Sequence, residues 1–512
     1  MRRVSVASGS QLSADAGAAI ADAGGNAVDA AIAAVLVSMC TDPGVIAPSA
    51  GGFLTIWPGD GEPVVIDAYA EMPGRGLPKE RFGRGGREVW LEYGGGMHTI
   101  VGPGSVAVPG ALAGFGLAID RYGTMPWREI LQPAIAASRD GFLVSGAAAE
   151  YLAYTHDAIF GWSPESYAVV HHEDGTPVGQ GDVIRMPDLA DTFSALAEEG
   201  PRLLYLGELG SQTVDAVQEG GGILTSEDLA AYRPIVRDPV IVDLDSWAVA
   251  TNPPPAVGGS CLAAMLLLVQ DHPFDAWSEA EVRTLVGVQR AVLGYRGRRL
   301  DPHDSDRAAE ADALLEMARL GDLPGIMAAP STVHTSAVDS EGCACSVTVS
   351  AGYGSGLMTP GTGFWLNNLL GEVELHPEGF HGVPPGTRLV SNMAPTVARG
   401  GNGSVLAIGS PGADRITTAI SSVLLNFIHL GMSLREAVAY PRVHAEVFHD
   451  VPTVACEPGL PVPSFDDLEI RQFPDISMYF GGVQAALWDP AAGHFEAADP
   501  RRAGGTARGG TE

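Results

Sequence analysis

A short stretch in the second half of the chain carries the residue types of a nucleophilic site. Residues 331–339 read Ser-Thr-Val-His-Thr-Ser-Ala-Val-Asp, and a turn at residues 340–342 leads into a second apolar run, residues 343–349. This alternation predicts a buried hairpin. If the chain is cut before Thr332, that residue has both a hydroxyl nucleophile and a free α-amine, whose pKa of about 7.7–8.0 suits a general base. The same pattern also fits a purely structural strand threonine.

Helices and hairpins are predicted around this stretch. An alanine-rich helix covers residues 12–23, and Asn26 is a good N-cap for a second helix that ends near residue 39. Residues 53–57 and 64–67 form a predicted hairpin, and residues 405–409 a strand that ends at Ser-Pro-Gly-Ala, residues 410–413. Helices followed by hairpins with short turns predict an α+β fold, in which antiparallel central sheets lie between helices in a four-layer αββα sandwich.

Three other segments give weaker patterns. Residues 241–249 alternate like a single strand, and the poorly patterned residues 298–330 are predicted to be a mobile connection before Thr332. The tail from Arg501 is rich in glycine, arginine and threonine and is predicted to be disordered.

The composition argues against several classes of function. A net charge of −31, from 61 acidic and 30 basic residues, repels phosphate backbones and anionic membranes, so we expect neither nucleic-acid nor membrane binding. The five cysteines show no disulfide or zinc spacing, and no cluster predicts a metal site. Without a recognisable signal peptide or membrane span, the expected location is cytoplasmic.

A series of motifs in order along the chain resembles the γ-glutamyltransferase (glutathione hydrolase) proenzymes, which are N-terminal nucleophile hydrolases. The motifs are Gly24–Ala31 (GGNAVDAA), Tyr122–Pro126 (YGTMP), Gln132–Ala134, Leu224–Leu229 (LTSEDL), Pro253–Pro255, Gly258–Gly259, Ser410–Gly412, Asn426, Gly431–Met432 and Pro441–Arg442. The resemblance implies autocatalytic cleavage between Ser331 and Thr332, at the head of a Thr-x-His-x-Ser-x-x-Asp motif. The products would be a large chain, residues 1–331, and a small chain, residues 332–512, which remain together as one intertwined domain.

The resemblance also implies roles for individual residues. Thr332 would be the nucleophile, Ser350 would orient its amine, and the N–H groups of Gly412 and Ala413 would form the oxyanion hole, with no cofactor. Alanine at position 413 keeps its N–H, so this departure from the family's glycine is mild unless the backbone there needs a positive φ. We expect His334 to be structural, because the α-amine already serves as the base.

Recognition of the acyl group departs further from the family pattern. Glu372 takes the place of a family aspartate that binds the substrate amine, and Ser391 with Asn392 replaces a serine pair that contacts its carboxylate. The family's carboxylate-binding arginine is replaced by Ala70, for which Arg75 is a candidate substitute. Tyr353 is a candidate to line the site.

The sequence therefore predicts a γ-glutamyltransferase-like amidohydrolase that hydrolyses or transfers the γ-glutamyl group of glutathione-like amides. Two alternatives stay open at this point. One is a related acylase that acts on an oxamate-type or cephalosporin-type amide, which the missing arginine favours. The other is an inactive homologue that does not process itself and binds a ligand or partner.

Overall fold

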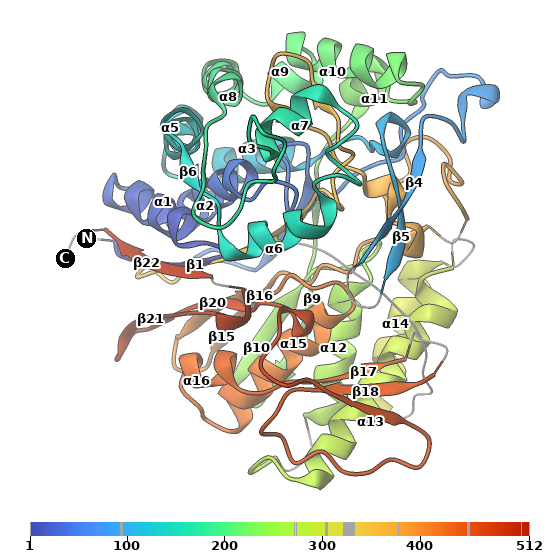
Figure 1. Cartoon of the computed structure of the whole chain (residues 1–512). Helices are drawn as coiled ribbons and strands as arrows, with labels where there is room; N and C mark the ends of the chain where they lie inside the picture. Colours follow the sequence, from blue (N-terminus) through green and yellow to red (C-terminus); the bar gives the residue numbers. More distant parts are fainter. Residues whose placement is uncertain are drawn as a thin grey trace.

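The computed structural model describes residues 2–92, 96–270, 272, 274–302, 306–320, 333–376, 378–447, 451–502 and 504–510. Two antiparallel sheets lie at its centre, and helices cover the outer face of each (Figure 1). This arrangement confirms the predicted α+β class with antiparallel sheets. In the described part of the chain, no helix is long and apolar enough to span a lipid bilayer.

The first sheet has seven strands, in the order β22-β1-β11-β12-β2-β3-β8. Helices α1, α2 and α3 pack directly on it, and α5 and α8 lie outside α2. The bounds are β1 Val4–Ser8, β2 Gly51–Trp57, β3 Val64–Ala68, β8 Ile235–Arg237, β11 Val333–Asp339, β12 Ala344–Ser350, β22 Gly505–Gly509, α1 Gln11–Asp22, α2 Ala27–Thr41, α3 Ala111–Tyr122, α5 Gln132–Asp140 and α8 Pro187–Glu199.

The second sheet has six strands, in the order β21-β20-β16-β15-β10-β9. Helices α12, α15 and α16 pack on it, while α13 and α14 lie against α12. The bounds are β9 Val240–Leu244, β10 Trp247–Thr251, β15 Thr396–Gly400, β16 Val405–Gly409, β20 Gln484–Asp489, β21 Gly493–Ala498, α12 Gly258–Val269, α13 Glu279–Tyr295, α14 Arg307–Leu320, α15 Arg415–Leu424 and α16 Leu434–Ala439.

Smaller elements surround the two sheets. They are the hairpins β4 Arg87–Leu91 with β5 Met97–Val101, β6 Phe142–Leu143 with β7 Val183–Ile184, and β13 Met358–Thr359 with β14 Phe364–Trp365; the strands β17 Val443–Glu446, β18 Thr453–Cys456 and β19 Glu469–Gln472; the helices α4 Trp127–Ile130, α6 Gly146–Thr155, α7 Pro164–Val170, α9 Arg202–Tyr205, α10 Glu208–Glu219 and α11 Ser226–Ala231; and the short helical turns η4 Leu369–Gly371, η7 Met478–Phe480 and η8 Pro500–Arg502.

Polar side chains join the facing surfaces of the two sheets. Ser336 Oγ on β11 donates to the backbone oxygen of Gln484 at 3.0 Å, and Ser346 Oγ on β12 donates to that of Ile408 at 3.0 Å. All residues of β11 and β12 are buried, because helix α2 covers one face of these strands and the second sheet covers the other. Burial of both faces explains why polar residues here are paired with backbone groups.

The hairpin predicted from the sequence is present. Strands β11 and β12 pair antiparallel, with His334 opposite Thr348, and the predicted hairpin at residues 53–67 appears as β2 and β3. Asn26 caps α2 as predicted, since its side chain accepts hydrogen bonds from the N–H groups of Val28 and Asp29.

Three sequence predictions were wrong. Residues 241–249 are not one strand: they belong to β9 and β10, which turn at Asp245, whose φ is 51°. Part of the expected mobile connection is the helix α14. The part of the tail at residues 505–509 is the strand β22, which pairs along the whole of β1 and so gains backbone hydrogen bonds that composition alone does not predict.

Candidate active site

The predicted nucleophile Thr332 and the predicted scissile residue Ser331 lie outside the described residues. The description resumes at Val333, the first residue of β11, which pairs with Val349 on β12. Ser350 is the last residue of β12, one position beyond that pair, and lies opposite Gly51 on β2. The start of β11 and Ser350 are therefore at the same end of the first sheet.

Ser350 has a buried hydroxyl that one backbone group already contacts. The side chain is 2% exposed, and its Oγ accepts a hydrogen bond from the N–H of Gly352 at 3.0 Å. A hydroxyl can accept and donate at once, so Oγ keeps its proton for another acceptor. This geometry is compatible with the predicted role of orienting an amine near the start of β11.

The loop between β16 and α15 presents two unused donors. Gly412 has a φ of 120° and Ala413 a φ of 67°, and neither backbone N–H donates to an acceptor within the described ranges. Both residues are buried. Adjacent N–H groups held in a buried turn are suited to stabilising a developing oxyanion.

The positive φ of Ala413 makes its difference from the family's glycine more costly than the sequence suggested. A left-handed conformation costs an L-residue with a Cβ roughly 1–2 kcal/mol. The surrounding structure compensates by fixing the loop: Gly482 N–H donates to Ser410 Oγ at 3.0 Å, and Arg415 Nε donates to the backbone oxygen of Tyr479 at 3.0 Å.

Buried charge follows directly after this loop. Asp414 contacts the Arg415 guanidinium, and its Oδ2 lies 3.4 Å from His444 Nε2. Burial by itself raises the pKa of Asp414, but the Arg415 guanidinium and the His444 ring outweigh it and hold this pKa well below its usual range. Asp414 therefore stays ionised and anchors the start of α15.

His334 lies between the two sheets with both ring nitrogens engaged. Its Nδ1 is 2.8 Å from Thr348 Oγ1, and its Nε2 is 2.8 Å from Ser336 Oγ. Burial lowers the pKa of His334 to about 3, so the ring is neutral at ordinary pH. A Cβ built on Gly409 would lie 2.3 Å from the ring, so His334 also fixes the approach of β16. These contacts fit the structural role expected for it.

The residues predicted to recognise the substrate are buried near other elements. Tyr353 accepts a hydrogen bond from Tyr151 at its backbone oxygen, at 2.8 Å, and Glu372, 1% exposed, follows η4. The backbone oxygen of Ser391 accepts from the N–H of Val257 at 2.9 Å, at the start of α12. Asn392 lies next in the chain and is 6% exposed.

Arg75, the candidate substitute for the family's arginine, is neutralised within the protein. Its Nη1 is 3.4 Å from Asp228 Oδ1, and its Nη2 is 3.3 Å from Glu71 Oε2. Ala70 beside it is fully buried. Arg75 therefore already has two carboxylate partners of its own.

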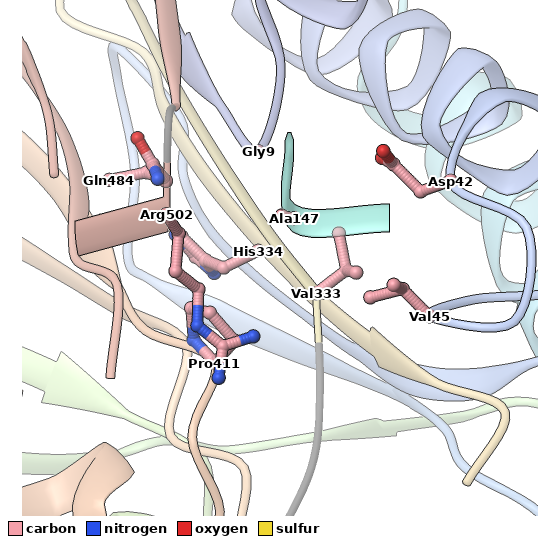
Figure 2. A pocket seen from close by; sticks show the side chains of 9 residues that line it. All are labelled: Gly9, Asp42, Val45, Ala147, Val333, His334, Pro411, Gln484 and Arg502. Carbon is pink, nitrogen blue, oxygen red and sulfur yellow. The ribbon is translucent and has the colours of Figure 1, made fainter. Parts of the chain in front are cut away.

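A cavity of about 30 Å³ lies beside the start of β11 (Figure 2). Both regions predicted to be catalytic border this cavity: Val333, at the start of β11, and Pro411, in the loop with the proposed oxyanion donors, are among its lining residues. None of the substrate-binding residues predicted from the sequence is among its lining residues, which are Gly9, Asp42, Val45, Ala147, Val333, His334, Pro411, Gln484 and Arg502.

Sequence reasoning missed three polar residues of this wall, Asp42, Gln484 and Arg502. Asp42 directly follows α2, Gln484 begins β20, and Arg502 ends η8, so they are far apart in the chain. Burial raises the pKa of Asp42 to about 7, although a hydrogen bond from Ser145 opposes the shift. One signal was available for Asp42, which is a single charged residue in the otherwise uncharged stretch of residues 30–59, whereas nothing in the sequence around Arg502 distinguishes it from the other arginines of the tail.

Comparison with known proteins supports the family resemblance that was drawn from the series of motifs. A family model described as Gamma-glutamyltranspeptidase matches residues 13–509. A glutathione hydrolase proenzyme of Escherichia coli (strain K12) is 28% identical over 97% of this chain and 90% of its own length. An acylase ACY 1 proenzyme of Pseudomonas sp. (strain V22) is 31% identical over 85% of this chain and 81% of its own.

Among solved structures, the cephalosporin acylase from Bacillus halodurans superposes with a TM-score of 0.79 at 25% identity. The match covers 99% of this chain and 96% of the acylase. Relatives of both kinds, glutathione hydrolases and acylases, thus share this chain's fold or sequence over most of their length.

Proposed function

Because this chain belongs to the gamma-glutamyltranspeptidase family, we propose that it is an autoprocessed amidohydrolase with Thr332 as its nucleophile. The observation that carries the proposal is the pair of N–H groups at Gly412 and Ala413 that donate to no acceptor in the described chain, in the loop that borders the same cavity as the start of β11. The layered arrangement of sheets and helices supports placing the chain among the N-terminal nucleophile hydrolases.

Processing would be the first reaction of the site. The Thr332 hydroxyl attacks the carbonyl carbon of Ser331, the peptide C–N bond breaks, and the nitrogen becomes the free α-amine of Thr332. The result is an ester between the two residues, which water opens to release residues 1–331 from residues 332–512. Each sheet contains strands from both segments, which supports the proposal that the two chains stay together as one domain.

Turnover would use the same atoms. The α-amine accepts the hydroxyl proton as the Thr332 oxygen attacks the substrate carbonyl, and the N–H groups of Gly412 and Ala413 stabilise the oxyanion. The amine of the substrate leaves with that proton, and the acyl group remains on Thr332. Water then releases the acid, or an acceptor amine takes the acyl group. Ser350 would orient the α-amine.

The first candidate substrate is a γ-glutamyl amide such as glutathione, as for the glutathione hydrolase relatives. The second is the amide of a non-glutamyl acid, as the names of the acylase relatives suggest. The specific observation for this second candidate is that Ala70 is fully buried and Arg75 is held by Asp228 and Glu71, so the family's carboxylate fork is missing at that place.

Intact mass spectrometry tests the proposal. We expect the purified protein to give two masses, corresponding to residues 1–331 and 332–512, and the Thr332→Ala variant to give one. Thr332→Ala should also lower amide hydrolysis by at least about a thousandfold, because nucleophile and base are lost together. Thr332→Ser keeps a hydroxyl and an amine and is the matched control. A wild-type protein that stays whole would instead support the inactive homologue.

A further inference from the structure

Two neighbouring arginines at the end of η8 have opposite surroundings. Arg501 has a fully buried side chain that contacts the Glu457 carboxylate and lies 3.0 Å from Asp499 Oδ1. The side chain of Arg502 has no hydrogen bond and no ion pair with any residue of the described chain, and its Nε is buried. Arg502 therefore carries a charge that the described part of the protein does not neutralise.

The backbone holds the Arg502 side chain against the cavity. A Cβ added to Gly482 would lie 2.6 Å from Cδ of Arg502 and 2.8 Å from its Cγ, so the aliphatic stem rests directly on the chain at Gly482. In Figure 2 the side chain extends from η8 toward Pro411, on the opposite side of the cavity from Asp42. The guanidinium thus faces the loop that contains the proposed oxyanion donors.

A buried acceptor lies in the same wall. Gln484 is 1% exposed, and its Oε1 has no hydrogen-bond partner among the described residues. An unsatisfied buried polar atom is unfavourable, so a ligand that pairs with it gains affinity. Arg502 offers donors to an anion, and Gln484 offers an acceptor to a neighbouring N–H or O–H group.

Three arginines with buried side chains show a different arrangement from that of Arg502. Arg388, Arg415 and Arg442 each contact a carboxylate within the protein. Arg502 is partly buried, with its Nε out of contact with solvent, and it has no carboxylate partner in the described chain although the sequence has an excess of acidic residues. An uncompensated guanidinium beside a reaction centre is the usual arrangement for binding a ligand carboxylate.

We propose that Arg502 binds a carboxylate on the acyl group of the substrate, and so replaces from the C-terminal segment the cation that is missing at Ala70. This inference rests on the proposed amidohydrolase function. It defines the substrate class as amides of dicarboxylic acids, in which one carboxyl forms the scissile amide and the other remains free. Both γ-glutamyl and glutaryl amides belong to this class.

Two substrates that differ only in a free carboxylate measure how much that carboxylate contributes to recognition. Glutaryl-p-nitroanilide and pentanoyl-p-nitroanilide have the same chain length and leaving group, and only the former carries the anion. We expect the wild type to prefer the glutaryl substrate. Arg502→Gln should lower the ratio of the two kcat/KM values about 10–100-fold, the range of a lost charged hydrogen bond, and Arg502→Lys should restore part of it.

Arg508→Gln is the matched control, since Arg508 lies on β22 in the same C-terminal segment with its side chain 53% exposed. It should leave the ratio as in the wild type. Equal ratios in the wild type and Arg502→Gln would overturn the role of Arg502. All proteins are first checked by mass for processing, so that loss of the glutaryl preference is read only in cleaved enzyme.

Binding gives a second readout that does not depend on turnover. In calorimetric titrations of the purified protein, glutarate should bind at least about tenfold more weakly to Arg502→Gln than to the wild type, whereas the neutral glutaramide should not distinguish them. A wild type that hydrolyses neither anilide contradicts the proposed function alone. Equal glutarate affinity in both proteins, or no glutarate binding to the wild type, contradicts the role of Arg502.

Discussion

Two charged regions of this protein differ in how completely they neutralise themselves. In the β3 charge cluster, defined by Asp67, Glu71 and Asp228, every carboxylate has an arginine: Arg237 Nη2 is 2.8 Å from Asp67 Oδ2, Arg388 Nη2 is 3.4 Å from Glu71 Oε1, and Arg75 holds Asp228. In the cavity beside β11, neither Arg502 nor Asp42 has an ion-pair partner in the described part of the chain.

The difference separates charges that hold the fold together from charges available to a ligand. A buried ion pair whose lone pairs and protons are all used contributes structure and leaves nothing to bind. A buried charge without a partner costs stability, and such groups concentrate at functional sites. The β3 charge cluster includes Glu71, next to the Ala70 position where the resemblance led us to expect a carboxylate-binding arginine, whereas the cavity holds charges without an ion-pair partner in the described chain.

Loss of Arg388 should have the largest effect, because it would break the β3 charge cluster. Arg388→Ala leaves Glu71 without one of its cations and removes the hydrogen bond to the Tyr232 hydroxyl at 2.6 Å. We expect a loss of about 3–5 kcal/mol in the free energy of unfolding, measured by urea denaturation. The Thr332→Ala background keeps the chain whole for this measurement.

The matched control is Arg202→Ala, whose side chain is 72% exposed in its pair with Glu199 and whose loss should cost under about 1 kcal/mol. If the two variants lose equal stability, the β3 charge cluster does not hold the fold. A drop in the glutaryl-to-pentanoyl ratio for processed Arg388→Ala would show that this cluster binds substrate after all.

Substitution of Asp42 tests whether the cavity beside β11 contains a charge without an ion-pair partner in the described chain. Its pKa is raised from 3.8 to about 7 by burial, so the folded protein binds this proton more tightly than the unfolded chain does. Stability should therefore fall as the pH rises from about 4 to about 7, by up to roughly 4 kcal/mol at 1.36 kcal/mol per pKa unit. Asp42→Asn should remove this slope and be the more stable protein at pH 8.

Urea denaturation at pH 5 and pH 8 measures the effect. Asp15→Asn removes an exposed carboxylate from α1 and should leave the difference between the two pH values as in the wild type. An unchanged pH difference in Asp42→Asn would mean that Asp42 is paired or solvated in the folded protein.

Ala413 gives the smallest expected effect and concerns backbone strain instead of charge. Ala413→Gly relieves the left-handed conformation, but glycine also gains freedom in the unfolded chain, so we expect a net stabilisation of about 0.5 kcal/mol. Ala216→Gly, within α10, should destabilise by about 1 kcal/mol under the same conditions. If both substitutions destabilise equally, the turn at Ala413 is not strained.

Local patterns predicted much of the framework around the site. The β11–β12 hairpin, the cap at Asn26 and the strand before Ser410 all follow from periodicity and turn residues within a few positions. The family match confirms the resemblance drawn from the motif series. Predictions failed where a distant partner decided the outcome, as for the tail that became β22 by pairing with β1.

The predicted site divides in the same way. The backbone N–H groups of Gly412 and Ala413, which donate to no acceptor in the described chain, lie in a loop whose sequence predicts a turn before a helix. The candidate arginine, by contrast, was sought near Ala70 because chain position was the only guide. Arg75 and Arg502 look alike in the sequence, and only their surroundings distinguish an arginine paired with carboxylates from one that has no carboxylate partner among the described residues.

The sequence by itself determined the family and much of the order of hairpins and helices, and it supplied the prediction that Thr332 is the nucleophile. These features depend on residue types at short spacing, because neighbouring residues determine turns, caps and hydrophobic periodicity. Only the tertiary structure decided the charge state of the site, because pairing and burial depend on residues hundreds of positions apart. Arg502 reaches the cavity because its side chain packs against Gly482, and only the tertiary structure shows that no carboxylate of the described chain pairs with it.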